Sequence, residues 1–124
     1  KGAYKKIVSK LILKLKKLGS ESKNLIAVIG PCISKNSYEV KDEFRKKFLK
    51  KNLKNIKFFK EVKHRIYFDL QGFIKLQLRN CGIDQIEIIE KDTFNFKNNF
   101  FSYRYSTKKN FDDYGRNISI IMIK

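Results

Sequence analysis

The first thirty residues place an amphipathic helical pattern directly before an apolar strand pattern, which favours folds in which helices cover a sheet. Apolar residues recur over residues 4–18 at the three- and four-residue spacing of one helical face, with lysines on the other face. Gly19 supplies the left-handed stop of this helix. The apolar run 25–29 then ends at Gly30-Pro31, where the chain turns because proline cannot continue a central strand.

A basic amphipathic helix of this kind could also lie on a membrane surface. We favour a helix that covers a sheet because the strand pattern follows at once. No apolar run approaches the roughly 20 residues that span a bilayer. The sequence therefore predicts a soluble protein with no membrane partner.

The middle of the chain alternates between the two kinds of pattern. A second helix is expected near residues 38–50, with Ser37 as its N-cap, acidic residues in its early turns and lysines in its late turns. Residues 52–63 are rich in lysine and are interpreted as an irregular connection. A short strand at 65–68 then leads to Asp69, which is placed to cap a third helix.

The last third of the chain is richer in strand patterns. Residues 85–90 alternate partially, 100–105 are an aromatic run, and 118–123 are a nearly continuous apolar strand of the fully buried kind. Helices alternate with strands at first and strands dominate later. The sequence predicts a single domain, residues 1–124, of the α/β or α+β class, with a mixed β-sheet covered by about three helices.

The formal net charge of +17 normally suggests nucleic acid or an anionic membrane as the partner. The basic residues are mostly lysine, whereas specific nucleic-acid surfaces favour arginine for its bidentate fork. Codon drift in an A- and T-rich genome would also produce this composition. No RNP-like, helix-turn-helix or finger motif is present, so nucleic-acid binding is kept as an alternative, together with a non-catalytic scaffold.

The reactive side chains are few. Cys32 and Cys81 are isolated from each other and from any metal-binding spacing, which predicts two free thiols and, with no export signal at the start, a cytoplasmic location. A pair of Cys32 with His64 is the one nucleophilic arrangement the chain could build alone, although nothing in the spacing brings them together. A zinc site, which needs three or four suitable ligands, cannot be assembled.

Two short segments are better candidates for ligand binding. Gly30 and Pro31 end a buried strand, where the missing Cβ of glycine lets a ligand approach the backbone. Ser102 and Arg104 alternate within the aromatic run, so both would point to the same face of a strand, where arginine can hold a phosphate or carboxylate. Arg104 could equally form a structural salt bridge at a sheet edge.

Four segments, read in order, resemble the C-terminal half of the YfiH-type laccase-domain family of purine nucleoside phosphorylases. Each segment matches a sequence block of that family in order and spacing. The segments are Ile29-Gly30-Pro31-Cys32-Ile33 with Ser37-Tyr38-Glu39-Val40, Tyr67-Phe68-Asp69-Leu70 with Gln77-Leu78 and Gly82-Ile83, Phe100-Phe101-Ser102-Tyr103-Arg104, and Gly115-Arg116.

The resemblance implies a YfiH-like fold of which residues 1–124 are the C-terminal portion. It implies that the intact protein cleaves adenosine, inosine and guanosine with phosphate, with adenosine deamination in some members, and that it binds zinc or copper. The family holds its metal with two histidines and a cysteine of the N-terminal half. This chain alone is therefore expected to bind no metal and to be inactive, to need that half as a partner, and to offer Gly30, Pro31, Ser102 and Arg104 to the nucleoside and phosphate.

Three positions depart from the family pattern. Asp92-Thr93 stands where the family usually has Cys-Thr, Tyr105 replaces the second arginine of the aromatic block, and Tyr114 precedes Gly115-Arg116 in place of threonine. Arg104 is kept. Of the three departures, only Tyr105 lies in the aromatic block that carries Arg104.

Overall fold

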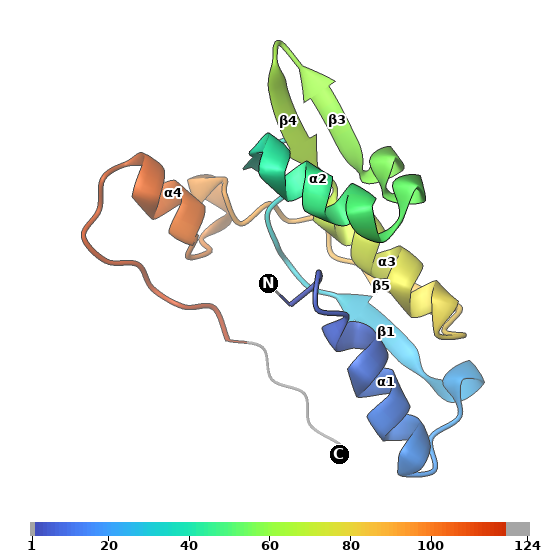
Figure 1. Cartoon of the computed structure of the whole chain (residues 1–124). Helices are drawn as coiled ribbons and strands as arrows, with labels where there is room; N and C mark the ends of the chain where they lie inside the picture. Colours follow the sequence, from blue (N-terminus) through green and yellow to red (C-terminus); the bar gives the residue numbers. More distant parts are fainter. Residues whose placement is uncertain (1, 119–124) are drawn as a thin grey trace.

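The computed structural model describes residues 2–118 of the chain. The strands form two sheets, one parallel with the order β1-β5 and one antiparallel with the order β2-β4-β3. Figure 1 shows α1 and α3 beside β1, the β3–β4 hairpin projecting from one end, and α4 set to one side. The elements are α1 (Ile7–Lys17), η1 (Ser22–Asn24), β1 (Ile26–Ile29), β2 (Glu39–Val40), α2 (Asp42–Lys51), η2 (Leu53–Phe58), β3 (Phe59–Val62), β4 (Arg65–Phe68), α3 (Leu70–Asn80), β5 (Gln85–Ile88), η3 (Phe96–Asn98) and α4 (Tyr103–Lys108).

This architecture confirms the predicted mixed α/β class, with parallel and antiparallel strands and several helices. The expected first and third helices correspond to α1 and α3, and the expected strands at 25–29, 65–68 and 85–90 correspond to β1, β4 and β5. Asp69 caps α3 as predicted, because its Oδ1 accepts a hydrogen bond of 2.9 Å from the Gly72 amide.

The parallel sheet is covered by helices on one face. Ile12 of α1, Leu78 of α3 and Ile83 form a buried cluster, against which Ala27 and Ile29 of β1 pack. Helix α3 contacts both strands, whereas α1 contacts α3. The opposite face of β1 is exposed, since Ile26 retains 67% and Val28 56% of its accessible surface.

An aromatic core joins the antiparallel sheet to the helices. Phe68 of β4 is 0% exposed. Its ring centre lies 5.0 Å from that of Phe48 in α2 and 5.8 Å from that of Phe73 in α3. Because α3 contributes Phe73 to this core and Leu78 to the other cluster, it connects the two sheets.

The second helix begins later than predicted. Residues 39–40 pair with β4 as β2, and α2 starts at Asp42 with Lys41 at the N-cap position and no side-chain cap. The prediction that Ser37 caps this helix was therefore wrong. The Ser37 hydroxyl instead donates to the Asp92 carboxylate, which removes it from the helix end.

The segment 52–63 is structured, so the predicted irregular connection was also wrong. It contains η2 and then β3, which pairs antiparallel with β4. Three of the four β3 residues are exposed, and this strand therefore lacks the alternation of apolar and polar residues that reveals a half-buried strand.

The aromatic run 100–105 does not form the predicted strand. Ser102 is instead the N-cap of α4, and its Oγ accepts a hydrogen bond of 3.3 Å from the Tyr105 amide. A serine that binds the backbone in this way favours the start of a helix over a strand. The strand expected at 118–123 lies outside the described residues, apart from Ile118.

Within residues 2–118, no helix has the length and the apolar character needed to cross a membrane.

Candidate functional site

The candidate site lies where two parallel strands end. The segments that follow β1 and β5 meet there, with a bridge between Cys32 and Asp92 and a 3.1 Å hydrogen bond from the Thr93 amide to the Cys32 carbonyl. Ligands of open α/β sheets commonly bind beyond the carboxyl ends of the strands. The topology therefore favours this end of the sheet as a binding site.

Asp92 joins the two segments. Its carboxylate accepts hydrogen bonds from the Ser34 hydroxyl at 2.7 Å and the Ser37 hydroxyl at 2.6 Å. It also accepts from the amides of Ser34, at 3.2 Å, and Phe94, at 2.9 Å. Burial by itself would raise the pKa of Asp92, but these hydrogen bonds favour the ionised form and hold the pKa below its ordinary value. Asp92 thus fixes the chain that carries Pro31.

Arg104 reaches the same region from α4. Its Nη1 donates to the Glu39 carbonyl at 2.9 Å, and the guanidinium carbon lies 5.5 Å from the centre of the Tyr38 ring. These contacts orient the side chain while most of its five N–H donors stay available. Arg104 is therefore placed to bind an anion without losing its contact to the protein.

Pro31, Ser102 and Arg104 line one hollow of about 370 Å³. This volume falls in the usual range for small-molecule sites. The structure thus brings together three of the four predicted site residues, which come from distant parts of the sequence. The full lining consists of Pro31, Cys32, Ile33, Tyr38, Thr93, Phe101, Ser102, Tyr103, Arg104 and Asn117.

Gly30, the fourth predicted residue, precedes this lining but does not belong to it. A Cβ built at Gly30 would meet no atom of the described chain, residues 2–118, within 4 Å. The space around this backbone is therefore open, and its predicted contact with a ligand stays a prediction.

The chemistry of the lining suits a planar ligand with an anionic group. Among the described residues of the lining, Arg104 is the one charged side chain, and Tyr38, Phe101 and Tyr103 provide aromatic surface. Ser102 uses an oxygen lone pair to cap α4, so its O–H can still donate to a ligand. The hollow offers one cation, one hydroxyl and aromatic walls within the same volume.

The Cys32–His64 pair is not brought together. His64 lies in the exposed turn of the β3–β4 hairpin, while Cys32 lies near Asp69, which follows β4 at the other end of the hairpin. Four residues of strand separate these ends by about 13 Å. Burial raises the pKa of the Cys32 thiol, and the charges of Asp92 and Asp69 raise it further, so Cys32 is protonated near neutral pH.

The cysteines and acidic residues do not build a metal site in the part of the chain that the structure describes. Both cysteines are free thiols, as predicted. No three His, Cys, Asp or Glu side chains between residues 2 and 118 are arranged to hold a metal ion. The described residues therefore do not fit the metal that the family resemblance implies.

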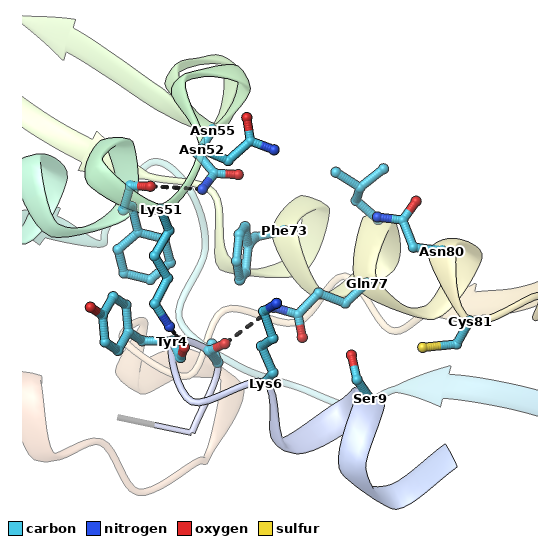
Figure 2. A pocket seen from close by; sticks show the side chains of 13 residues that line it. Tyr4, Lys6, Ser9, Lys51, Asn52, Asn55, Phe73, Gln77, Asn80 and Cys81 are labelled. Atoms are coloured by element: carbon cyan, nitrogen blue, oxygen red, sulfur yellow. Dashed lines mark hydrogen bonds between the residues drawn. The ribbon is translucent and has the colours of Figure 1, made fainter. Parts of the chain in front are cut away.

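A larger hollow, of about 530 Å³, lies between the N-terminal turn, α2 and α3. Figure 2 shows Lys51 and Gln77 reaching the N-terminal turn, where Lys51 donates to the Tyr4 carbonyl at 2.7 Å and Gln77 to the Ala3 carbonyl at 3.1 Å. The Gln77 Oε1 atom is buried and has no hydrogen-bond partner among residues 2–118. Lys51 and Gln77 thus bind the backbone of the N-terminal turn, and none of the predicted site residues lines this hollow.

Three residues of the candidate site were not singled out from the sequence. Tyr38 orients Arg104, Thr93 lines the hollow, and Asp92 fixes the segment after β1. Asp92 stood out only as a departure from the family pattern, and Thr93 only as the matching residue beside it. The signal that could have found Asp92 is its position in the segment that follows a strand, with hydroxyl residues following the neighbouring strand.

Comparison with known proteins supports the resemblance over the whole chain. Residues 1–124 match the family described as multi-copper polyphenol oxidoreductase laccase. The chain is 38% identical over 125 residues to the purine nucleoside phosphorylase RP494 of Rickettsia prowazekii, an alignment that covers 99% of this chain and 51% of the relative. It is 44% identical over 96 residues to RC0672 of Rickettsia conorii, also named a purine nucleoside phosphorylase, which covers 76% of this chain and 39% of the relative.

A solved structure agrees with the sequence comparisons. The crystal structure of the hypothetical protein YfiH of Bacillus licheniformis superposes with a TM-score of 0.76 at 26% identity, covering 87% of this chain and 42% of the YfiH chain. The chain thus spans about half the length of the R. prowazekii relative and less of the YfiH structure. Together, the matched residues, the relatives and the shared fold establish that the chain belongs to the YfiH-type family described as multi-copper polyphenol oxidoreductase laccase.

Proposed function

We propose that residues 1–124 are the C-terminal half of a purine nucleoside phosphorylase and form one wall of its nucleoside- and phosphate-binding site. The observation that carries this proposal is the meeting of Pro31, Ser102 and Arg104 in one hollow at the end of β1. Two relatives are named purine nucleoside phosphorylases, which supports the substrate class. In this proposal the enzyme is cytoplasmic, and the other wall comes from the half of the relatives that this chain does not span.

The residues of the hollow match the demands of phosphorolysis. Such a reaction requires a phosphate held next to the ribose and a purine held in a fixed orientation. Arg104 would bind the phosphate through its remaining N–H donors, and Ser102 would donate to phosphate or ribose. Tyr38, Phe101 or Tyr103 would provide the face against which the purine lies. Pro31 and Gly30 would leave the backbone open to the ligand.

The proposed enzyme would hold its zinc or copper ion with residues of the other half. The described residues of this chain lack a ligand set, so its own contribution is to bind and orient nucleoside and phosphate. The chain alone is expected to be inactive for the same reason.

Phosphate-dependent release of purine base from adenosine, inosine and guanosine tests the proposal. The chain is assayed alone and after co-expression with the N-terminal half of the R. prowazekii relative, both with added zinc. We expect release only from the complex. Release by the chain alone would show that our placement of the chemistry is wrong, and no release by a formed complex would favour a non-catalytic scaffold.

Variants then test the role of Arg104. Arg104→Gln should lower kcat/KM of the complex about 10- to 100-fold, the cost of losing a hydrogen-bonded charge on an anion. Arg79→Gln is the matched control, because Arg79 is an exposed arginine in the last turn of α3. Equal activity of the two variants would show that Arg104 does not bind phosphate in the proposed site.

A further inference from the structure

The helix layer of this chain is wider than the sheet beneath it. Helices α1 and α3 lie side by side on one face of the parallel sheet. Two packed helices span roughly 20 Å, because each is about 10 Å across with its side chains. Two strands span only roughly 10 Å, at about 4.8 Å per strand. The described sheet therefore fills about half of the area that the helices could cover.

The part of the helix layer that has no described strand beneath it lies on the β1 side of the sheet. Helix α3 contacts both β1 and β5, whereas α1 packs on α3 and lies beside β1 in Figure 1. A second apolar stripe, formed by Ile7 and Leu11 of α1 and by Leu18 at its C-cap, runs beside the buried stripe and is exposed. A helix that covers a sheet normally buries such residues against a strand. The exposed stripe is therefore placed to meet a strand next to β1.

The backbone of β1 directs hydrogen-bonding groups toward the edge where such a strand would pair. The Ile29 carbonyl accepts a hydrogen bond from the Ile89 amide on the β5 side. Peptide groups alternate in direction along a strand, so those of Val28 and Ile26 point to the other edge. Within residues 2–118, β1 pairs with no strand on that edge. Unpaired edges of this kind add strands from other polypeptides.

The exposed face of β1 also favours an additional strand beside it. Parallel strands are usually buried on both faces, and their side chains are then apolar throughout. β1 has this composition, yet Ile26 and Val28 are exposed on the face away from the helices. Within the described residues, β1 thus has both an exposed apolar face and an unpaired edge.

We infer that β1 receives a strand along its free edge from the polypeptide that corresponds to the other half of the family relatives, and that this strand packs under Ile7, Leu11 and Leu18. The inference rests on the proposed function, which requires that half for activity. The length of the relatives supports this occupant, since the chain spans 51% of RP494 and 42% of the YfiH structure. The docking surface is formed by the free edge of β1, its exposed face and the second stripe of α1.

Co-expression and hydrogen exchange test the inference. The tagged 124-residue chain is produced with the untagged N-terminal half of RP494, and the two halves of RP494 are the positive control. We expect a one-to-one complex in which the Val28 amide exchanges at least about tenfold more slowly than in the chain alone. A complex without protection of β1, or no complex when the control pair associates, would overturn the inference.

Substitutions locate the contact. Val28→Glu and Leu11→Glu should each reduce the recovered partner about tenfold, because a charge would be buried at the interface. Leu53→Glu is the control, since Leu53 is 77% exposed in η2, outside the docking surface. Equal recovery with Val28→Glu and the parent chain would contradict the proposed contact.

Two other occupants give different results. Protection of Val28 that rises with the concentration of the chain alone would identify a second copy as the occupant. Protection in the chain alone that disappears when residues 119–124 are deleted would identify its own C-terminal segment. Either result would overturn the inference. A protected complex without phosphorolysis would support it and count against the proposed function alone.

Discussion

The carboxylate of Asp92 accepts a hydrogen bond of 2.6 Å from the hydroxyl of Ser37, which lies 55 positions earlier in the chain. This contact joins the segment after β5 to the segment after β1 and so holds Pro31 and Thr93 at the same hollow. Because the hollow also receives Arg104 from α4, its shape depends on a carboxylate that need not touch a ligand.

We expect Asp92→Asn to lower the free energy of unfolding at neutral pH by about 1–2 kcal/mol, toward the low end for hydrogen bonds to a charged group because Asp92 is partly solvated. The difference between the parent chain and the variant should depend on pH. The pKa of Asp92 is lowered by folding, so its stabilisation is complete above the unfolded pKa of about 3.9 and is lost as the pH falls through the folded pKa.

Urea unfolding at neutral pH and in steps below about pH 4 measures this difference. Asp84→Asn is the control, because Asp84 is an exposed carboxylate between α3 and β5, and it should change stability by less than about 0.5 kcal/mol. A difference between Asp92→Asn and the parent chain that grows on acidification would contradict the assigned sign.

Gly115 is required by the ring of Phe101. A Cβ at position 115 would overlap this ring, whereas one at Gly30 would meet no atom of the described chain within 4 Å. We therefore expect Gly115→Ala to separate the segment around Asn117 from Phe101. The Phe101 amide donates to the Asn117 Oδ1 at 2.9 Å, so its hydrogen exchange should accelerate. Gly30→Ala is the control, and similar acceleration in both variants would rule out a steric cause.

The elements that sequence predicted well have signals within the element itself. Arg65–Phe68 is a short run with aromatic and β-branched residues, and Asp69 follows it in the position of a helix cap. Both predictions required only neighbouring residues, and both agree with the structure. Ser102 shows the limit of this approach, since an alternation of polar and aromatic residues suited a strand while the serine hydroxyl capped a helix.

The site was predictable only in part, because its geometry arises from distant segments. The charge of Arg104 and the turn at Pro31 identified these two residues as candidates from the sequence. Their positions in the same hollow depend on the hydrogen bonds of Ser37 with Asp92 and of Arg104 with Glu39. No local pattern encodes these pairs. β3 was missed for a related reason, as its partner β4, and not its own composition, makes it a strand.

Phe68 should be among the most sensitive positions for stability. Its ring is fully buried and contacts the rings of Phe48 and Phe73, so Phe68→Ala leaves a cavity and should cost about 3–5 kcal/mol. Phe68→Leu should cost less and keeps the test informative if the alanine variant does not fold. Urea unfolding measures both, and Leu53→Ala, at an exposed position, should stay within about 0.5 kcal/mol of the parent chain.

Cys32 should react slowly with alkylating reagents near neutral pH. Burial, followed by the charges of Asp92 and Asp69, raises the pKa of its thiol, and the thiolate is the reactive form. In a Cys81→Ser variant, the rate of iodoacetamide modification of Cys32 should rise with pH to a midpoint above the ordinary value of about 8.5. The same variant unfolded in urea is the matched reference and should show the ordinary midpoint.

Asp92→Asn should move the folded midpoint down, because it removes one of the charges that oppose the thiolate. A folded midpoint at or below that of the unfolded chain would show that Cys32 is activated, and a nucleophilic role for this thiol would then have to be reconsidered.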